Sequence, residues 1–366
     1  MITKIKLKNF RIFKEKTIDF SPGVNIILGK NGVGKTSVLE AIYFTAFTKS
    51  FKAPKDIDML KEGEDFFQIQ SFWEDVLYEH AQANFLKGQG KRFIFDEENM
   101  KRFSDIIGVF PIVFQSPEDF KVTAGANMER RIYFDRFISQ ISKSYLDDLM
   151  RYQRLLKMRN AYLKQLNEMK SYSYDTQLDI YDEQLYPLAY KISSLRQKYC
   201  EMFNRELEEL YQSTFTNGSI GSIGFIPFLK TENEENFIAE YMSESKNNID
   251  KEIILKRTMQ GCNYDKFNFF RNERPLIHFA SQGEHKIWMT MLKLAEGTII
   301  KKVHKKDAIY LLDDLFAELD VSNTQKIVEK ILNMKQVLIT TTDSSDLRLR
   351  DINKDEKALN IIEICQ

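Results

Sequence analysis

The sequence contains few cysteines and no excess of charge of either sign. Its three cysteines, Cys200, Cys262 and Cys365, are scattered and odd in number, so they predict neither a disulfide framework nor a zinc site. The 53 basic residues balance 53 acidic ones. The electrostatic argument for nucleic acid that a strongly basic chain would give is therefore missing. A case for DNA must come from local charge or from a resemblance.

Long apolar runs are absent as well. No stretch approaches the roughly 18 apolar residues that a membrane helix needs, which argues against a transmembrane protein. The first residues alternate between polar and apolar, unlike the continuous apolar core of a signal peptide. A hydrophobic content of 43% is typical of soluble globular proteins. We therefore expect a cytoplasmic protein without membrane contact, and 366 residues suffice for about two domains.

Hydrophobic periodicity predicts an α/β head. Residues 2–7 alternate and residues 24–28 form a short β-branched run, so both are expected to be strands. Residues 37–47 have helical character. The stretch 64–114 predicts further strands, with a hairpin at 87–90.

Residues 144–215 predict a helical arm. Apolar residues recur there at spacings of three, four and seven, with a polar break at 171–176. Two long helices folded back on each other are expected. A 26-residue helix spans only about 39 Å, so this arm is much shorter than the coiled coil of a chromosome-folding ATPase. In the polar stretch 216–280, Gly218, Gly221 and Gly224 are interpreted as turns.

Buried-strand runs return at 308–312 and 337–340, and an amphipathic helix is expected at 322–334. The predicted architecture is α/β, with a head and a helical arm insertion that forms a second domain. The expected segments are an N-terminal head part at 1–140, the arm at 141–230 and a C-terminal head part at 231–366.

A phosphate-binding motif stands between the predicted strand 24–28 and the predicted helix 37–47. It satisfies the pattern G-x-x-x-x-G-K-[ST] in the order strand, loop, helix. Lys35 can reach the β- and γ-phosphates, and Thr36 can supply a hydroxyl to Mg²⁺. We therefore expect ATP and Mg²⁺ as cofactors, with Lys35 also a catalytic residue. The nucleotide-binding residues of this loop are Gly29, Lys30, Asn31, Gly32, Val33, Gly34, Lys35 and Thr36.

Two acids follow the predicted strand 308–312, as in a Walker B motif. Asp313 is expected to hold Mg²⁺ through water, and Asp314 to polarise the attacking water. An acidic strand end is also common as a surface turn. The pairing with a phosphate loop favours the catalytic interpretation.

A third motif, Ser281-Gln282-Gly283-Glu284, precedes a helical run. Serine followed three residues later by glutamate is the capping-box pattern. A hydroxyl, a glycine and a helix N-terminus also make an anion site. Both interpretations stay open, because a cap that opens towards a partner subunit can also bind that subunit's γ-phosphate.

The order of these motifs resembles the head of ABC-type ATPases, with 281–284 as the signature motif and Leu319-Asp320 as the D-loop. The resemblance implies an ABC-type ATPase head, a P-loop NTPase, with the helical arm as an insertion that forms a second domain. Within that superfamily the sequence is similar to the RecF family of recombination mediators. The resemblance rests on Asn9-Phe10-Arg11, the phosphate loop, Lys49-Ser50-Phe51-Lys52, Ser116-Pro117-Glu118-Asp119, Arg130-Arg131 with Phe134-Asp135, residues 279–283 and residues 312–320.

The resemblance implies roles that the motifs alone leave open. Ser281 and Gly283 would bind the nucleotide of the other subunit, and Gln115 would sense Mg²⁺ and the γ-phosphate. Most ABC proteins have Glu where this chain has Asp314, and His where it has Thr341 or Thr342. A shorter carboxylate and no imidazole should weaken the activation of water, which fits a slow ATPase that serves as a conformational switch. The resemblance implies that this ATPase depends on DNA.

Partners are also implied by the family. ATP would close a homodimer over double-stranded DNA near a single-strand gap or junction, and a partner of the RecR type would help to load recombinase. The implied context is recombination, DNA repair, DNA replication and the SOS response to DNA damage.

Two clusters of basic residues carry local charge. The cluster Lys301, Lys302, Lys305 and Lys306 is interpreted as a solvated loop. In the first arm helix the charge is either a solvated face or a surface that tracks DNA phosphates. Its basic residues, against Glu168 alone, are Arg151, Arg154, Lys157, Arg159, Lys164 and Lys170.

Two rival functions share the ATPase head. The ATP-binding subunit of a membrane transporter would normally be shorter and would lack the arm and Ser116-Pro117-Glu118-Asp119. An ABC-headed DNA nuclease would need a further acidic metal cluster after Asp320, where too few residues remain for another domain.

Overall fold

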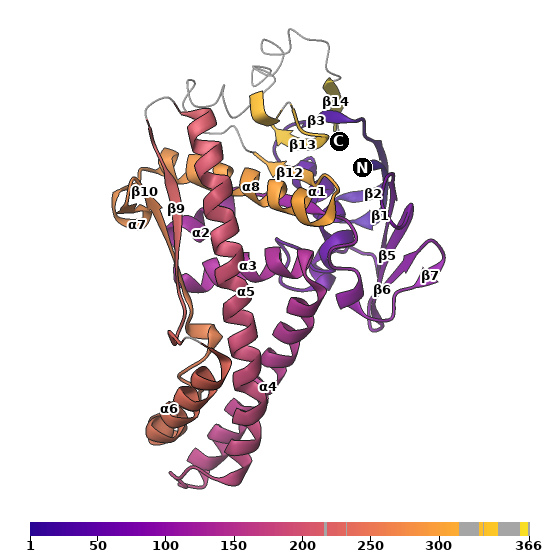
Figure 1. The fold of residues 1–366 in the computed structure, drawn as a ribbon. Coiled ribbons are helices and arrows are strands. Elements are labelled where there is room, and N and C mark those ends of the chain that lie inside the picture. The colour runs from indigo at the N-terminus through magenta and orange to yellow at the C-terminus, as the bar shows by residue number, and fades with distance from the viewer. Residues whose placement is uncertain (216–217, 232, 315–328, 332, 343–358, 365–366) are drawn as a thin grey trace. The chain divides into compact units, whose positions relative to one another are not determined.

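The computed structural model describes the chain except for residues 216–217, 232, 315–328, 332, 343–358 and 365–366 (Figure 1). The chain forms two compact units: the first contains residues 1–120, 209–218 and 280–366, and the second contains residues 121–208 and 219–279. The bounds expected from the sequence, after residues 140 and 230, differ from those of the units. The division into a head part at 1–140, an arm at 141–230 and a second head part at 231–366 therefore stays a prediction.

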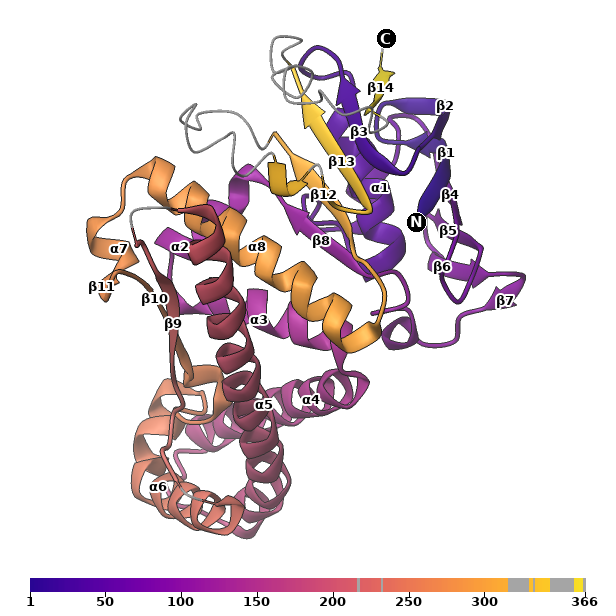
Figure 2. The same ribbon diagram turned by 45° about the horizontal axis from the view of Figure 1, so that its top comes forward.

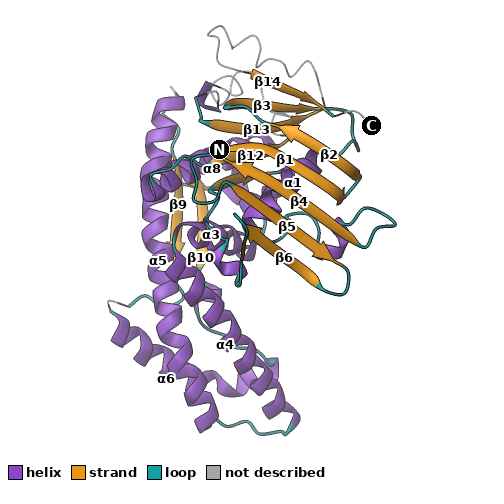
Figure 3. Ribbon diagram, turned by 90° about the vertical axis from the view of Figure 1, so that its right-hand side faces the viewer, coloured by secondary structure: helices purple, strands orange, loops and turns teal. Residues whose placement is uncertain are grey.

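The first unit contains an antiparallel sheet of order β2-β1-β4-β5-β6-β7 (Figure 3). The strand expected at 2–7 is present, and β5 and β6 pair as the hairpin expected at 87–90. Inward-facing residues such as Phe67 and Ile69 alternate with polar ones, as in a sheet with one solvated face. The strands are β1 (Ile2–Phe10), β2 (Phe13–Asp19), β4 (Phe66–Trp73), β5 (His80–Leu86), β6 (Gly90–Phe95) and β7 (Glu98–Asn99).

The second sheet of this unit has the order β14-β3-β13-β12-β8, and all its neighbouring strands are parallel. The strands expected at 24–28, 308–312 and 337–340 are confirmed, whereas β14 was not expected. Most of the helix expected at 322–334 lies outside the described residues. The strands are β3 (Gly23–Leu28), β8 (Ile112–Gln115), β12 (Ile309–Asp313), β13 (Gln336–Thr341) and β14 (Leu359–Glu363).

Helix α1 (Lys35–Phe47) contacts strands of both sheets and is buried along most of its length. The helix expected at 37–47 is therefore confirmed. Phe44 of α1 packs edge-on against Phe67 with ring centroids 5.7 Å apart, within the range of about 4.5–7 Å that is typical of aromatic pairs. Because α1 begins directly after the phosphate loop, this core fixes the loop's position.

Helix α8 (Gln282–His304) also belongs to the first unit. It continues through Lys301 and Lys302, and Lys305 is its C-cap with φ 58°. The interpretation as a solvated loop was therefore wrong for Lys301 and Lys302, which are helical, whereas Lys305 and Lys306 follow the helix, and all four lysines are exposed. Cations in the last turn of a helix are stabilised by the helix dipole.

The second unit combines helices with a small antiparallel sheet of order β11-β10-β9 (Figure 2). The two long helices expected at 144–215 are confirmed as α4 and α5, whereas α6 was not expected. Gly221 and Gly224 lie inside β9, so their interpretation as turns was wrong. The elements are α2 (Phe120–Ala124), α3 (Asn127–Ile141), α4 (Lys143–Glu168), α5 (Thr176–Thr214), β9 (Gly221–Ile226), α6 (Glu234–Leu255), β10 (Lys266–Arg271), β11 (Arg274–Pro275) and α7 (Leu276–Phe279).

Short 3-10 turns complete the described elements. They are η1 (Asp56–Met59), η2 (Phe103–Asp105), η3 (Pro117–Asp119) and η4 (Cys262–Tyr264). Among the helices that the structure describes, none is long and apolar enough to cross a membrane.

A buried ion cluster joins α4, α5 and α6 in the second unit. Arg159 is fully buried and donates to Asp182 at 2.6 Å and to Glu252 at 2.6 Å. Burial opposes its charge, but the two carboxylates outweigh burial and raise the pKa of Arg159. Arg159 was counted among the surface charges of the arm, and this was wrong. The other five basic residues of that cluster, Arg151, Arg154, Lys157, Lys164 and Lys170, are exposed.

Candidate nucleotide site

The parallel sheet brings distant sequence segments to one edge. Parallel strands point the same way, so their carboxyl ends meet at a single edge of the sheet. The loop 29–34 leaves β3 there, Gln115 ends β8, Asp313 ends β12 and Thr341 ends β13. The edge thus gathers residues from the beginning, the first third and the end of the chain.

Glycines are required in the loop between β3 and α1. Gly32 and Gly34 have φ values of 85° and 97°, a region in which residues with a Cβ are strained. A Cβ on Gly34 would lie 2.6 Å from the ring of Phe13. A Cβ on Gly29 would lie 2.7 Å from the carbonyl oxygen of Ile364. The loop can therefore hold its tight backbone path only with glycine at these positions.

Lys35 is folded back over this loop. Its ammonium donates to the carbonyl oxygens of Gly29 at 2.7 Å and Lys30 at 3.0 Å. Burial lowers the pKa of Lys35, while Asp314 and Asp313 act in the opposite direction. A cation therefore stands at the N-terminal end of α1, where the helix dipole also favours anions.

Two hydroxyl groups donate to the Asp313 carboxylate, one from α1 and one from the neighbouring strand β13. Thr36 donates to its carboxylate oxygens at 2.9 and 3.1 Å, and Thr340 donates at 2.6 Å. The structure thus brings together Thr36 and Asp313, as the motifs predict. Thr340 was missed, because its role depends on the pairing of β12 with β13, which the sequence does not display.

The side chain of Gln115 is fixed in one orientation. Thr290 of α8 donates to the carbonyl oxygen of Lys286 at 3.0 Å, which uses its hydroxyl proton. It can therefore only accept from Gln115, whose Nε2 donates to it at 3.2 Å. The amide oxygen of Gln115 is buried and has no hydrogen-bond partner among the residues that the structure describes. Thr290 was not identified from the sequence.

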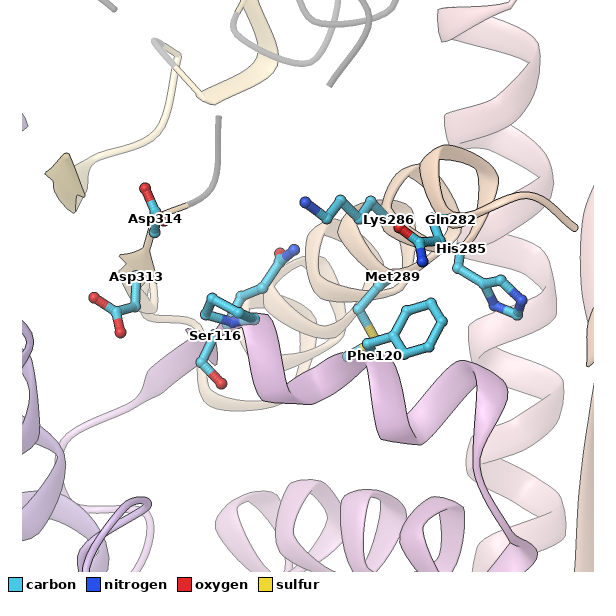
Figure 4. A pocket seen from close by; sticks show the side chains of 10 residues that line it. Ser116, Phe120, Gln282, His285, Lys286, Met289, Asp313 and Asp314 are labelled. Carbon is cyan, nitrogen blue, oxygen red and sulfur yellow. The ribbon is translucent and has the colours of Figure 1, made fainter. Parts of the chain in front are cut away.

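A cavity of 320 Å³ opens at this edge of the sheet (Figure 4). Figure 4 shows Asp313 and Asp314 on one side of it, and side chains of α8 on the other. The α8 residues follow the helical spacing of three, four and seven, which the sequence contains but which a packed helix face would share. The lining residues are Gln115, Ser116, Pro117, Phe120, Gln282, His285, Lys286, Met289, Asp313 and Asp314.

Asp314 follows the end of β12 with φ 52°. Aspartate tolerates this left-handed conformation better than most residues. Its backbone N–H donates to Thr340 Oγ1 at 3.1 Å, so Thr340 contacts both acids of the motif. Thr341 is buried at the end of β13, while Thr342 is exposed.

Ser281 is the N-cap of α8. Its hydroxyl accepts from the N–H of Glu284 at 3.3 Å, and the carboxylate of Glu284 accepts from the N–H of Ser281 at 2.8 Å. The capping box is therefore formed. Among the described residues, Ser281 bonds only within its own helix, so a nucleotide role of Ser281 and Gly283 stays a prediction. The D-loop residues Leu319 and Asp320 lie outside the described residues.

Comparisons with known proteins agree with this geometry. Residues 1–355 match the family model of the RecF/RecN/SMC N-terminal domain. The DNA replication and repair protein RecF of Acholeplasma laidlawii is 33% identical over 341 residues, which cover 93% of each chain. The chain belongs to the RecF family. Its fold is accordingly an ABC-type ATPase head with a helical arm, as the sequence predicts.

Two solved structures are similar in fold over most of the chain. One is described as the recombination mediator protein RecF-ATPrS in the RecFOR pathway, with a TM-score of 0.85 and 28% identity over 94% of this chain and 93% of that one. The other is described as RecF-ATP in the same pathway, with a TM-score of 0.85 and 26% identity over 94% and 92%.

Proposed function

We propose that this member of the RecF family is an ATP-dependent, DNA-binding recombination mediator that acts in DNA repair and replication. ATP with Mg²⁺ would drive dimerisation, and the dimer would bind double-stranded DNA near single-strand gaps and help to load recombinase. The observation that carries the nucleotide part is the amide oxygen of Gln115, which has no partner among the described residues and belongs to a side chain that lines the same cavity as Asp313.

The oxygen atoms at this edge fit a magnesium ion. The Thr36 hydroxyl donates its proton to the oxygens of Asp313 at 2.9 and 3.1 Å, which leaves its lone pairs for Mg²⁺. The Asp313 carboxylate would hold the ion through a water molecule, because Mg²⁺ usually keeps several waters. A buried acceptor without a donor costs about 1–3 kcal/mol, and a hydrated cation would satisfy Gln115. Mg²⁺ would supply positive charge for the phosphates of the nucleotide.

The chain's own residues divide the remaining work. Residues 29–34 direct backbone N–H groups at phosphate oxygens, and Lys35 adds a charge-assisted bond when it leaves its present carbonyl partners. Asp314 orients and polarises the attacking water. Because its carboxylate is one methylene shorter than the usual glutamate, and threonine stands where a histidine is usual, hydrolysis is expected to be slow.

Gly283 supports a role of the α8 N-terminus in the dimer. Glycine costs about 0.8–1 kcal/mol in a helix relative to alanine. A Cβ at Gly283 would meet nothing within 4 Å in the described part of the chain, so packing within the chain does not require it. Close approach of the other subunit's nucleotide would require a glycine at this position, and Ser281 would be a further ligand of that nucleotide.

The exposed basic side chains of α4 are the proposed contacts to DNA phosphates. Arg151, Arg154 and Lys157 are exposed, and Lys164 is 3.9 Å from Glu168, a separation worth little at a solvated surface. A partner of the RecR type would join this complex, since the similar structures are described as parts of a RecFOR pathway.

The proposal is tested by measuring the oligomeric state with ATP and Mg²⁺, with and without gapped duplex DNA. The expected result is a dimer that requires ATP and is favoured by the DNA. Lys35→Ala serves as the control, because loss of the phosphate-loop ammonium should abolish the dimer while the fold remains. A wild-type protein that stays monomeric with ATP and gapped DNA, or a Lys35→Ala protein that dimerises normally, would sink the proposal.

A further inference from the structure

Strand β9 is an edge strand of the small sheet in the second unit. Within the described residues it pairs with β10 alone, so that Phe225 stands opposite Phe267 and Ile223 opposite Phe269. Asn204 of α5 donates to the carbonyl oxygen of Ile223 at 2.9 Å, and the N–H of Ile223 donates to Asn204 Oδ1 at 2.7 Å. The backbone of Ile223 therefore points away from β10.

The backbone N–H and C=O of Phe225 point to the same side as those of Ile223, because the direction of these groups repeats every two residues along a strand. Its cross-strand neighbour supports this. Phe267 accepts from Arg130 at its carbonyl and donates its N–H to Asn127, so both groups point away from β9. The N–H and C=O of Phe225 have no partner among the described residues. Such an edge is a template for another strand.

A groove of 820 Å³ lies along this edge, lined by residues of β9, α5, α6 and the segment 227–231. Figures 1 and 2 both show β9 running beside α5. Its apolar lining includes Phe225, Leu229 and Phe237, and Phe237 and Leu229 are buried. The groove therefore offers apolar contact next to two unused backbone groups.

The charge at the groove is positive. Lys198 and Lys230 line it, and neither has an acidic partner within the described part of the chain. Glu201 is the acid in the lining, and Gln197 donates to it at 3.4 Å. An acidic ligand would therefore find two lysines that are not already neutralised.

We propose that this groove binds an extended, acidic segment of a partner protein by strand addition to β9. The segment would pair its backbone with Phe225, place alternate apolar side chains on Phe237 and Leu229, and direct acidic side chains towards Lys198 and Lys230. This surface involves no residue of the nucleotide site, so it is independent of the proposed ATP function.

The test uses the full chain without nucleotide and a capped heptapeptide that alternates aspartate with isoleucine or phenylalanine. Two comparison peptides carry lysine in place of aspartate, or N-methyl groups on the backbone. The double variant Lys198→Glu, Lys230→Glu removes the basic rim. Lys251→Glu is the control, because Lys251 is an exposed lysine of α6 outside the groove.

The acidic peptide should bind the wild type and the Lys251→Glu control equally, and bind the double variant about tenfold more weakly. It should slow hydrogen exchange at the amide of Phe225, and the N-methylated peptide should not. Failure of the acidic peptide to bind would overturn the proposal. Equal binding of the lysine or N-methylated peptides would also overturn it.

Discussion

Thr290 shows how one hydroxyl sets the chemistry of a buried side chain. Its proton is directed to the carbonyl oxygen of Lys286, so it accepts from the amide nitrogen of Gln115. The amide oxygen is thereby the atom left for the cavity. A residue that contacts neither phosphate nor metal can thus position a proposed Mg²⁺ sensor.

We expect Thr290→Val to weaken Mg²⁺-dependent ATP binding by up to about tenfold, since one hydrogen bond contributes about 0.5–1.5 kcal/mol. Loss of the acceptor allows the Gln115 amide to turn its nitrogen towards the cavity. Thr298→Val is the matched control, because Thr298 of α8 makes the same bond to a helix carbonyl, that of Leu294 at 3.1 Å. Titration with Mg²⁺ at fixed ATP separates the two. Equal Mg²⁺ dependence in both variants would rule out the positioning role.

Asp314→Asn should separate binding from hydrolysis. The amide keeps the shape of the side chain but cannot accept a proton, so ATP hydrolysis should fall by about 10²-fold or more. Nucleotide binding and the dimer should persist, because Thr36 and Asp313 are unchanged. Hydrolysis and dimer formation are measured on the same preparation. An unchanged hydrolysis rate would move the water-activating role to another residue.

Some residues of the candidate site can be predicted from the sequence, and others cannot. Lys35, Thr36 and Asp313 stand in motifs whose spacing is local, so they could be predicted without a structure. Thr340 and Thr290 act through the register of β13 against β12 and through the contact of α8 with β8. A threonine in a strand or helix has no local feature that reveals such a partner.

The first turn of helix α8 has one observed role and one proposed role. Its capping box satisfies helix N–H groups within the chain, and the same end is proposed to meet the nucleotide of another subunit. The capping box is formed, but a cap serves a helix whether or not a second subunit approaches. Substitutions of different size distinguish the two roles.

Ser281→Arg should abolish ATP-driven dimerisation while leaving ATP binding to the monomer intact, because a bulky cation blocks approach at the α8 N-terminus. Ser281→Ala removes only the cap and should cost about 1 kcal/mol of stability. Dimerisation, ATP affinity and melting temperature are measured for both. Normal dimers from Ser281→Arg, with only a lowered melting temperature, would reduce Ser281 to a helix cap.

The arm helices depend on a buried charge at Arg159. Replacing it by methionine leaves Asp182 and Glu252 buried without their cation, which should cost about 3–5 kcal/mol. Arg154→Met, an exposed arginine on the same helix, should change stability by no more than about 0.5 kcal/mol. Urea unfolding compares the two variants. Similar midpoints would show that the cluster contributes little.

At the scale of the whole molecule, the predicted division into head and arm followed from strong helical periodicity in 144–215. Helix α6 was not predicted from the sequence because it is rich in polar residues, and only some of its apolar residues, such as Tyr241 and Ile253, are buried. Strand β14 was not predicted because it is short. Both elements are defined by what they pack against rather than by a local signal.

DNA binding should depend on the exposed face of α4. Replacing Arg154 and Lys157 by alanine should weaken binding to duplex DNA of any sequence and lower the salt slope of log K by about 2. The measurement is DNA affinity at several salt concentrations. Lys251→Ala on α6 provides a control for loss of positive charge. An unchanged slope in the double variant would place the DNA elsewhere.

Strand β3, which leads into the phosphate loop, has consequences for synthesis on the ribosome. Its two neighbours in the sheet are β13 and β14, which are translated about 300 residues later. At about 5–20 residues per second this delay is about 15 to 60 s. The antiparallel sheet has all its strands within the first 99 residues and can pair early. The phosphate loop of the nascent chain therefore follows a strand β3 that has no paired neighbours during most of translation. Nucleotide cannot assist folding until translation is nearly complete.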